Sequence, residues 1–165
     1  MEEWREIRDF PGYSVSDQGH IRNDETGRIL ALLRNQQGLY YVGLSKNLVQ
    51  HKRSVPLLVA EAFLPEPPYE TFDTPINLDG DRHNNSANNL EWRPRWFAVK
   101  YFQQFHGGYR EEVLKSVEEE MTGEWFSKTW VAATKYGLLH RELLVATLNR
   151  TDVWPTHQKF RMVSK

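Results

Sequence analysis

The chain contains no cysteine, and this absence excludes disulfide bonds, cysteine–zinc sites and thiol chemistry. It has no run of apolar residues close to the roughly 20 that a membrane-spanning helix needs. Its first residues, Met-Glu-Glu-Trp-Arg-Glu, do not form a signal peptide. Neither sign of charge dominates, since the formal net charge is −1. We therefore expect a cytoplasmic protein with no membrane partner.

Apolar residues are plentiful enough for a packed core. Hydrophobic residues make up 39% of the 165 residues and aromatic residues 13%, which argues against wholesale disorder. A chain of this length forms one ordinary domain or two to three small modules. The composition therefore predicts a folded protein and leaves its division into modules open.

The charges are unevenly distributed along the chain. Residues 92–110 carry four bases and no acid, and residues 128–165 carry seven bases and two acids. Residues 65–91 and 111–127 each carry six acids and one base. The two basic segments predict local binding of an anion such as nucleic acid, despite the near-neutral total. The alternative is chance clustering on solvated faces.

The first fifty residues are expected to form a small antiparallel sheet with hairpins. Residues 13–16 alternate apolar and polar side chains as a half-buried strand does, residues 20–23 resume the strand, and residues 40–44 are rich in β-forming types. Turn signals separate these segments: Pro11-Gly12, Asp17-Gln18-Gly19, Glu25-Thr26-Gly27 and Gln36-Gln37-Gly38.

Three helices are expected in the middle of the chain. The first covers residues 55–63 and has Pro56 in its first turn, where proline is tolerated. The second covers residues 95–104 and has an apolar face. The third is a charged helix over residues 110–121, which Gly123 ends.

The last forty residues predict two helices joined by a tight turn. Ser127 can cap the first helix, Gly137 lies in the turn, and residues 140–149 form the second helix. In a helix-turn-helix unit the start of the second helix faces the major groove of DNA, and His140 and Arg141 would lie there. The alternative is a plain helical hairpin that packs on the rest of the protein.

Residues 76–92 are the most informative part of the sequence. A turn of Asp79-Gly80-Asp81 is followed by an asparagine-rich loop, and then by Asn-Leu-Glu-Trp leading into a helix. We expect Asp79 to shape the turn and Gly80 to adopt a positive φ.

Three blocks of the sequence, in this order, resemble a known family. Residues 4–19 look like the NUMOD4 motif, residues 58–63 and 79–92 look like an HNH domain, and residues 125–160 look like a C-terminal DNA-binding repeat with a helix-turn-helix. The ordered set is similar to the phage-type HNH homing endonucleases.

That resemblance implies an α+β fold with a small N-terminal antiparallel sheet, a ββα-metal (HNH-like) module and a C-terminal helix-turn-helix. It implies double-stranded DNA as the partner, a monomer, and the cytoplasm of a bacterial host for a phage-encoded protein. The expected modules are a NUMOD4-like β module at 1–50, the HNH-like module at 51–106, a charged helical linker at 107–124 and the DNA-binding module at 125–165.

The resemblance fails at the catalytic positions. Alignment on Asp79-Gly80-Asp81 puts Asn77 where the family has its general-base histidine, and Ile76 where it has the preceding metal ligand. The last ligand belongs six residues after Trp92, at Ala98. Isoleucine and alanine cannot ligate a hard cation, and an asparagine amide cannot act as a general base. The sequence therefore predicts no catalytic residue, no metal site and no other cofactor.

The residues that shape the family's loop are retained, and we expect them to have a structural role. They are Asp79, Gly80, Asn84, Asn85, Asn89 and Trp92.

The leading hypothesis is a DNA-binding protein, derived from an HNH homing endonuclease, that lacks cleavage activity and has a possible regulatory role. Basic side chains would contact phosphates and the second helix of the helix-turn-helix would read bases. The residues expected at the DNA surface are Arg93, Arg95, Lys100, Lys128, Lys135, His140, Arg141 and Arg150.

Two alternatives remain open. The first is an active Mg²⁺-dependent nicking endonuclease with nonstandard ligands, for which Asp79 and His83 are the candidates. The second is a protein-interaction module that acts on a host or virion protein through its acidic helix over residues 111–124 and its six tryptophans.

Overall fold

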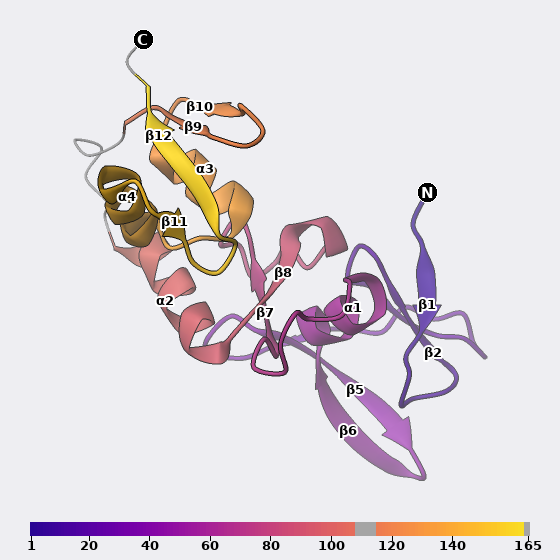
Figure 1. The fold of residues 1–165 in the computed structure, drawn as a ribbon. Coiled ribbons are helices and arrows are strands. Elements are labelled where there is room, and N and C mark those ends of the chain that lie inside the picture. Colours follow the sequence, from indigo (N-terminus) through magenta and orange to yellow (C-terminus); the bar gives the residue numbers. More distant parts are fainter. Residues whose placement is uncertain (108–114, 164–165) are drawn as a thin grey trace. The chain divides into compact units, whose positions relative to one another are not determined.

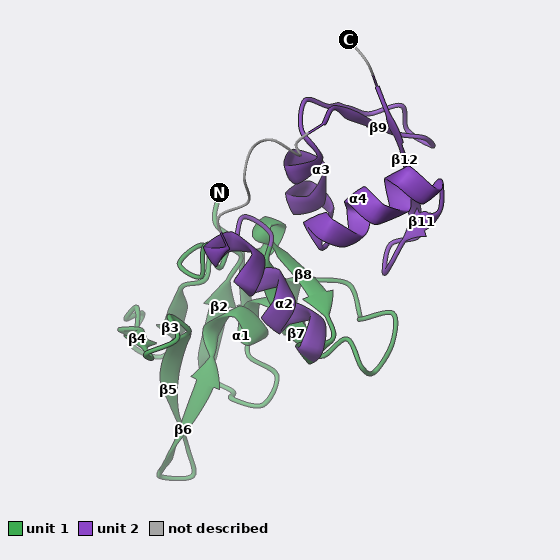
Figure 2. Cartoon of the chain, turned by 90° about the vertical axis from the view of Figure 1, so that its left-hand side faces the viewer, with its two compact units in different colours: residues 1–77, 81–95 green, residues 78–80, 96–165 purple. Residues whose placement is uncertain are grey.

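A computed structural model describes residues 1–107 and 115–163 (Figure 1). Its elements are helices and small antiparallel sheets, so the predicted α+β class is confirmed. The chain divides into two compact units, coloured separately in Figure 2. The first unit holds residues 1–77 and 81–95, and the second holds residues 78–80 and 96–165.

The first unit begins with a three-stranded antiparallel sheet. Its strands β1 (Trp4–Glu6), β2 (Tyr13–Ser16) and β3 (Ile21–Asn23) lie in the order β1-β2-β3. The expected strands at 13–16 and 20–23 are thus confirmed, and the glycine of each predicted turn in this region has a positive φ. Short turns hold the register because glycine adopts these angles without strain.

A second three-stranded sheet follows, made of β4 (Leu33–Arg34), β5 (Tyr40–Lys46) and β6 (Val49–Ser54). Strand β6 was not expected, because Val-Gln-His-Lys-Arg-Ser is mostly polar; its pairing with β5 over six residue pairs stabilises it instead. The module boundary expected after residue 50 therefore falls inside a continuous hairpin.

The turn between β5 and β6 has an unusual residue. Asn47 and Leu48 form a two-residue connection with φ angles of 52° and 61°. Turns of this kind favour Asn-Gly, because the left-handed region costs an ordinary side chain about 1–2 kcal/mol. Leu48 thus occupies a position where glycine would be more stable.

Helix α1 (Val55–Phe63) packs against strands β2, β5 and β6, with Pro56 in its first turn as expected. Its side chains Val55, Leu58 and Val59 pack into one buried cluster with strand residues such as Val15 and Leu44. Removing this apolar surface from water contributes most of the stability of such a small unit.

The HNH-like segment also contributes a hairpin to the first unit. Strand β7 (Thr74–Asn77) pairs antiparallel with β8 (Leu90–Arg93), so that Asn77 lies opposite Leu90. A single 3₁₀ turn, η1 (Ala87–Asn89), precedes β8. The long connection between the two strands carries the asparagine-rich loop.

The described residues of the second unit form three helices and a four-stranded sheet. Helix α2 (Arg95–His106) runs two residues further than expected. The strands are β9 (Val117–Glu119), β10 (Trp125–Phe126), β11 (Asp152–Val153) and β12 (Gln158–Met162), in the order β10-β9-β12-β11.

The predicted charged helix over residues 110–121 is wrong where the structure describes it. Residues 108–114 lie outside the described part of the chain, and Val117–Glu119 form strand β9. Val117 and Glu119 are buried, and Glu119 accepts hydrogen bonds from the Met121 and Thr122 backbone and from the Thr122 hydroxyl. Pairing with β12 therefore outweighs the helical propensity of the glutamates.

The two C-terminal helices agree closely with the sequence. Helix α3 covers Thr129–Tyr136, α4 covers His140–Asn149, and Gly137 adopts a left-handed conformation between them. Ser127 is not the cap, however, because the residue before α3 is Lys128. Ala132, Leu138 and Leu143 anchor both helices in the core of this unit. Within the described residues, none of the helices is long and apolar enough to cross a membrane.

Candidate functional site

The asparagines of the loop between β7 and β8 hold it in shape. Asn77 donates from Nδ2 to the Asn84 carbonyl at 2.8 Å and to the Asn85 side-chain oxygen at 3.1 Å. Asn89 donates to the same Asn84 carbonyl at 2.8 Å, and Asn85 donates to the Arg82 carbonyl at 3.2 Å. The loop backbone is thus satisfied by amide side chains, which supply both donors and acceptors.

We expect Asn77→Ala to lower the free energy of unfolding by about 2 kcal/mol, because it removes two hydrogen bonds at a side chain that is only 2% exposed. Denaturant unfolding measures the change. Asn88→Ala, at an exposed position of the same loop, is the matched control and should cost well under half as much. Equal losses in the two variants would contradict the structural role of Asn77.

The catalytic positions of the family are buried here. Ile76 and Ala98 are almost fully inaccessible, as is Asn77. The first two offer no oxygen to a cation, and the amide of Asn77 is committed to the loop. Across the described residues, the structure contains no group of three or more histidine, aspartate or glutamate side chains arranged to hold a metal ion. The positions present do not fit the Mg²⁺ that the resemblance implies.

The fallback residue His83 already has partners within its own unit. Its Nδ1 lies 2.6 Å from the Tyr40 hydroxyl, and the two rings meet edge-on at 5.2 Å. Its backbone amide donates to the Asp81 carboxylate at 2.9 Å. The side chain is exposed but held in place, and Asp79, the other fallback residue, is exposed in the second unit.

Gly80 has the positive φ expected of it, 76°. A Cβ atom at this residue would lie 2.5 Å from Cγ and Cε1 of Phe105 on α2. The neighbouring Leu78 carbonyl accepts a hydrogen bond from the Tyr101 hydroxyl at 2.6 Å. The segment 78–80 is therefore fixed on the aromatic face of α2, and glycine is required where the backbone meets the ring.

Trp92 also has a structural role, as expected of the residues that shape the loop. Its indole nitrogen donates to the Pro65 carbonyl at 3.1 Å, and its ring packs with Ala60 and Phe72. These contacts hold strand β8 against helix α1 and the segment that follows it.

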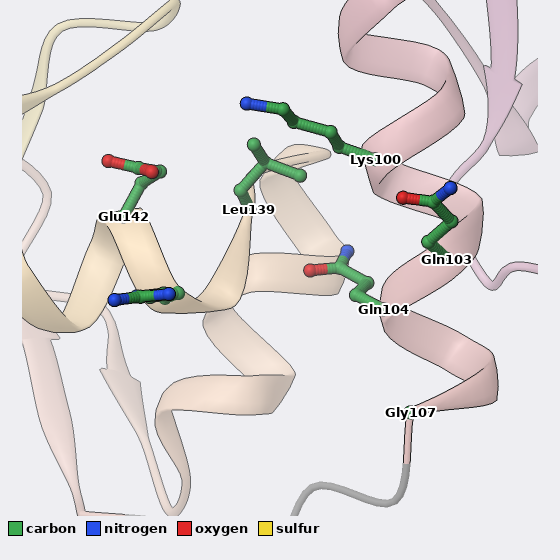
Figure 3. Close-up of a pocket in the computed structure, with 7 residues that line it drawn as sticks. Lys100, Gln103, Gln104, Gly107, Leu139 and Glu142 are labelled. Carbon is green, nitrogen blue, oxygen red and sulfur yellow. The ribbon is translucent and has the colours of Figure 1, made fainter.

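Two of the predicted DNA-contacting residues line the same cavity. Lys100 from α2 and Arg141 from α4 border a cavity of about 490 Å³ in the second unit (Figure 3). Gln103, Gln104, Leu139 and Glu142 also line it. Both cations are exposed, so this surface offers them to an anion, although the carboxylate of Glu142 lies in the same wall.

Gln104 joins α2 to the start of α4. Its side-chain oxygen accepts a hydrogen bond from the His140 backbone amide at 3.0 Å, and its nitrogen donates to the Leu138 carbonyl at 3.3 Å. The amide satisfies a donor at the first turn of a helix, which the helix itself cannot pair. This bridge sets the positions of Lys100 and Arg141 relative to each other.

His140 was expected at the DNA surface, and the structure corrects this. The side chain is 1% exposed, its Nε2 lies 2.8 Å from the Thr129 hydroxyl, and its ring meets Trp130 edge-on. Helical periodicity alone does not show which face of α4 meets α3. The burial of His140 removes it from the residues available to DNA and makes it part of the helix–helix contact.

Burial lowers the pKa of His140. The unfolded chain therefore binds a proton at His140 more readily than the folded chain does. The neutral side chain's contribution to folding stability is complete above about pH 6.5, and it is lost as the pH falls below that value. We expect the free energy of unfolding to decrease as the pH falls from about 7.5 to about 5.5. Denaturant titrations at the two pH values measure this.

His140→Gln should abolish that pH dependence, and His106→Gln should preserve it, since His106 is exposed. An unchanged pH dependence in His140→Gln would show that another group is responsible.

The remaining predicted DNA-contacting residues differ in accessibility. Arg93 is 4% exposed and donates to the Trp92 carbonyl at 2.7 Å, so it is not on the surface. Lys135 is exposed but ion-paired with Glu124, whose hydrogen bond raises the pKa of the lysine. Arg95, Lys128 and Arg150 are exposed.

Sequence reasoning missed a basic group in the first unit. Lys46, Lys52 and Arg53 lie on the β5–β6 hairpin. The signal was available, since residues 26–60 hold five bases and no acid. The segment was missed because the acids Glu25 and Glu61 border it, so that a charge count over a longer stretch balances.

Comparison with known proteins agrees with this architecture. Residues 2–45 match the model of the NUMOD4 motif. Two uncharacterized HNH endonucleases of Acanthamoeba polyphaga mimivirus, L245 and L247, are 36% identical over 89 residues and 33% identical over 92 residues. Over about half of its length, this chain is therefore similar to proteins described as HNH endonucleases. Each alignment with the mimivirus proteins covers 54% of this chain and 26% or 23% of the relative, so this chain spans about a quarter of their length.

A solved structure shares the fold of this chain over 99% of its length. It is described as DNA binding and cleavage by the HNH homing endonuclease I-HmuI, and it covers 99% of both chains with a TM-score of 0.56 and 21% identity. At this identity the likeness establishes the fold. The resemblance to HNH homing endonucleases is confirmed.

Proposed function

We propose that this protein binds double-stranded DNA on an HNH homing endonuclease scaffold without cutting it. The observation that carries the loss of cleavage is Asn77. It stands where the family has its base histidine, it is buried, and the hydrogen bonds that its amide donates to Asn84 and Asn85 close the loop. An amide has no useful basicity, so it cannot take a proton from water at this position.

The metal positions support the same proposal. Ile76 on β7 and Ala98 on α2 replace oxygen or nitrogen ligands with hydrocarbon. A divalent ion in such a site would act as a Lewis acid on the scissile phosphate. Losing the base and both ligands together removes groups that act as a unit, and the rate is expected to fall by many orders of magnitude.

Exposed cations support DNA binding. Lys100 and Arg141 line one cavity, and Arg141 lies in the first turn of α4, the part of a helix-turn-helix that meets the major groove. Arg95, Lys128 and Arg150 add exposed positive charge along α2 and around α3 and α4. A regulatory role on DNA would follow from binding without cleavage.

An electrophoretic mobility shift with a pool of random-sequence duplexes tests the proposal. At low salt the protein should shift duplex DNA. The logarithm of the affinity should fall linearly with the logarithm of the salt concentration. Selecting the retained duplexes over several rounds would then yield the preferred site. Failure to shift any duplex at low salt would end the DNA-binding proposal.

The nicking alternative has a separate test. Supercoiled plasmid incubated with the protein and Mg²⁺ or Mn²⁺ should stay supercoiled. Nicking that disappears in the Asp79→Ala, His83→Ala variant would overturn the loss of cleavage and assign those residues to a relocated site. The protein-interaction alternative has lost one of its supports, because part of the expected acidic helix is strand β9. We further propose that the protein acts as a monomer, which light scattering on the DNA complex would check.

A further inference from the structure

The tip of the β5–β6 hairpin presents an apolar side chain to solvent. The hairpin projects from the rest of the first unit in both views (Figures 1 and 2). Lys46 pairs with Val49 at its end, and the turn residues between them leave Leu48 fully exposed and Val49 largely exposed. A projecting leucine adds nothing to the core of the unit.

The backbone at the tip makes leucine a poor choice for stability. Leu48 has a φ of 61° in a two-residue turn that glycine would satisfy without strain. A polar residue would also be better solvated there. Strain of this kind, where the fold does not need the side chain, indicates that the side chain has another use.

Strands β5 and β6 of the hairpin carry positively charged side chains. Lys52 lies with Nζ 4.1 Å from the Tyr41 ring centroid, and Lys46 donates to the Asp9 carbonyl at 2.8 Å. Arg53 lies over the ring of Phe10, near the start of α1, and interacts there with the carboxylate of Glu61. Lys46 and Lys52 are nevertheless exposed, and an ammonium group has three N–H donors, so both can also contact an external anion.

An exposed apolar tip between two strands that carry lysines is complementary to duplex DNA. Base pairs offer flat apolar faces between two rows of phosphates, and proteins that bend DNA insert leucine or similar wedges between base steps. Phosphate contacts from lysines supply the accompanying affinity.

We propose that the β5–β6 hairpin inserts Leu48 as a wedge between adjacent base pairs of bound DNA, while Lys46 and Lys52 contact the flanking phosphates. This rests on the proposed DNA binding and adds a deformation of the duplex to it. The hairpin would unstack one base step and locally unwind the helix.

Unwinding of plasmid DNA measures the wedge without knowledge of the target site. Relaxed plasmid is incubated with saturating protein and with a topoisomerase that needs no metal ion, in EDTA to prevent any nicking, and is then deproteinised. Wild-type protein should leave the plasmid supercoiled, because the topoisomerase relaxes the turns that compensate for unwinding at each wedge.

Variants of one position separate the wedge from binding. Leu48→Ala and Leu48→Gly should lose the unwinding, lose only a few-fold in affinity in a mobility shift, and keep the wild-type salt dependence. Leu48→Met should retain the unwinding, since methionine is also a wedge residue. Leu33→Ala removes an exposed leucine from β4 of the same unit and should behave as wild type. Leu48→Gly should unfold at the wild-type temperature or above it, which excludes misfolding as the cause of its defect.

The outcomes distinguish the two proposals. Equal unwinding by wild type and Leu48→Ala, or a shift by wild type without any unwinding, overturns the wedge and leaves DNA binding in place. The absence of any shift overturns DNA binding and the wedge together.

Discussion

The double variant Lys100→Ala, Arg141→Ala is expected to bind duplex DNA roughly fifty-fold more weakly than wild type at about 0.1 M salt. Each phosphate contact contributes about 0.9 to the slope of log affinity against log salt, so the loss of two should lower that slope by about 1.8. The two side chains line one cavity and Gln104 fixes their supporting helices, so they can contact the same stretch of backbone.

Fluorescence anisotropy of a labelled duplex at several salt concentrations measures both the affinity and the slope. The matched control is Lys135→Ala, Arg161→Ala, which makes the same change in net charge. Its two cations are already ion-paired, to Glu124 and Glu118 respectively. The control should weaken binding only a few-fold, and an equal effect of the two double variants would show that net charge alone, and not this surface, decides affinity.

Gly80→Ala is expected to destabilise the protein by about 3 kcal/mol, from about 1–2 kcal/mol for an alanine at positive φ and a similar amount for overpacking. The added Cβ would lie 2.5 Å from Cγ and Cε1 of Phe105. That ring cannot easily move aside, because it packs against Tyr101 at 5.4 Å and Trp130 at 5.1 Å between ring centroids.

Denaturant unfolding of Gly80→Ala and Gly123→Ala separates the two causes. Gly123 has a φ of 69° in the same unit, and a Cβ there would meet no atom of the described residues within 4 Å. Gly123→Ala should therefore lose only the free energy of unfolding that an alanine costs at a positive φ. In the Phe105→Leu background, Gly80→Ala should lower the free energy of unfolding by less than it does in the wild-type background. Equal destabilisation by the two glycine variants would refute the steric role of Phe105.

Helices with strong local signals were predicted well. Residues 55–63 and 140–149 form the expected helices α1 and α4, since Pro56 favours a helix start and Gly137 a left-handed helix end. The strands β6 and β9 were not predicted. Their residues are mostly polar or acidic, and their stability comes from partners that lie close in space and, for β9, forty residues away in the chain.

The candidate site shows the same division. Residue identities by themselves indicated the resemblance to HNH homing endonucleases, and they predicted non-catalytic residue types at Ile76, Asn77 and Ala98. They also predicted the positive φ of Gly80, because a turn of this composition needs one.

Only the tertiary structure decided which of the predicted side chains face solvent. It buries His140 against Thr129, withdraws Arg93, and brings Lys100 and Arg141 to one cavity. Burial and hydrogen-bond partners depend on which elements meet, and those contacts join residues far apart in the chain. The sequence therefore determined which functional groups stand in the loop, and the packing determined which of the predicted cations are exposed.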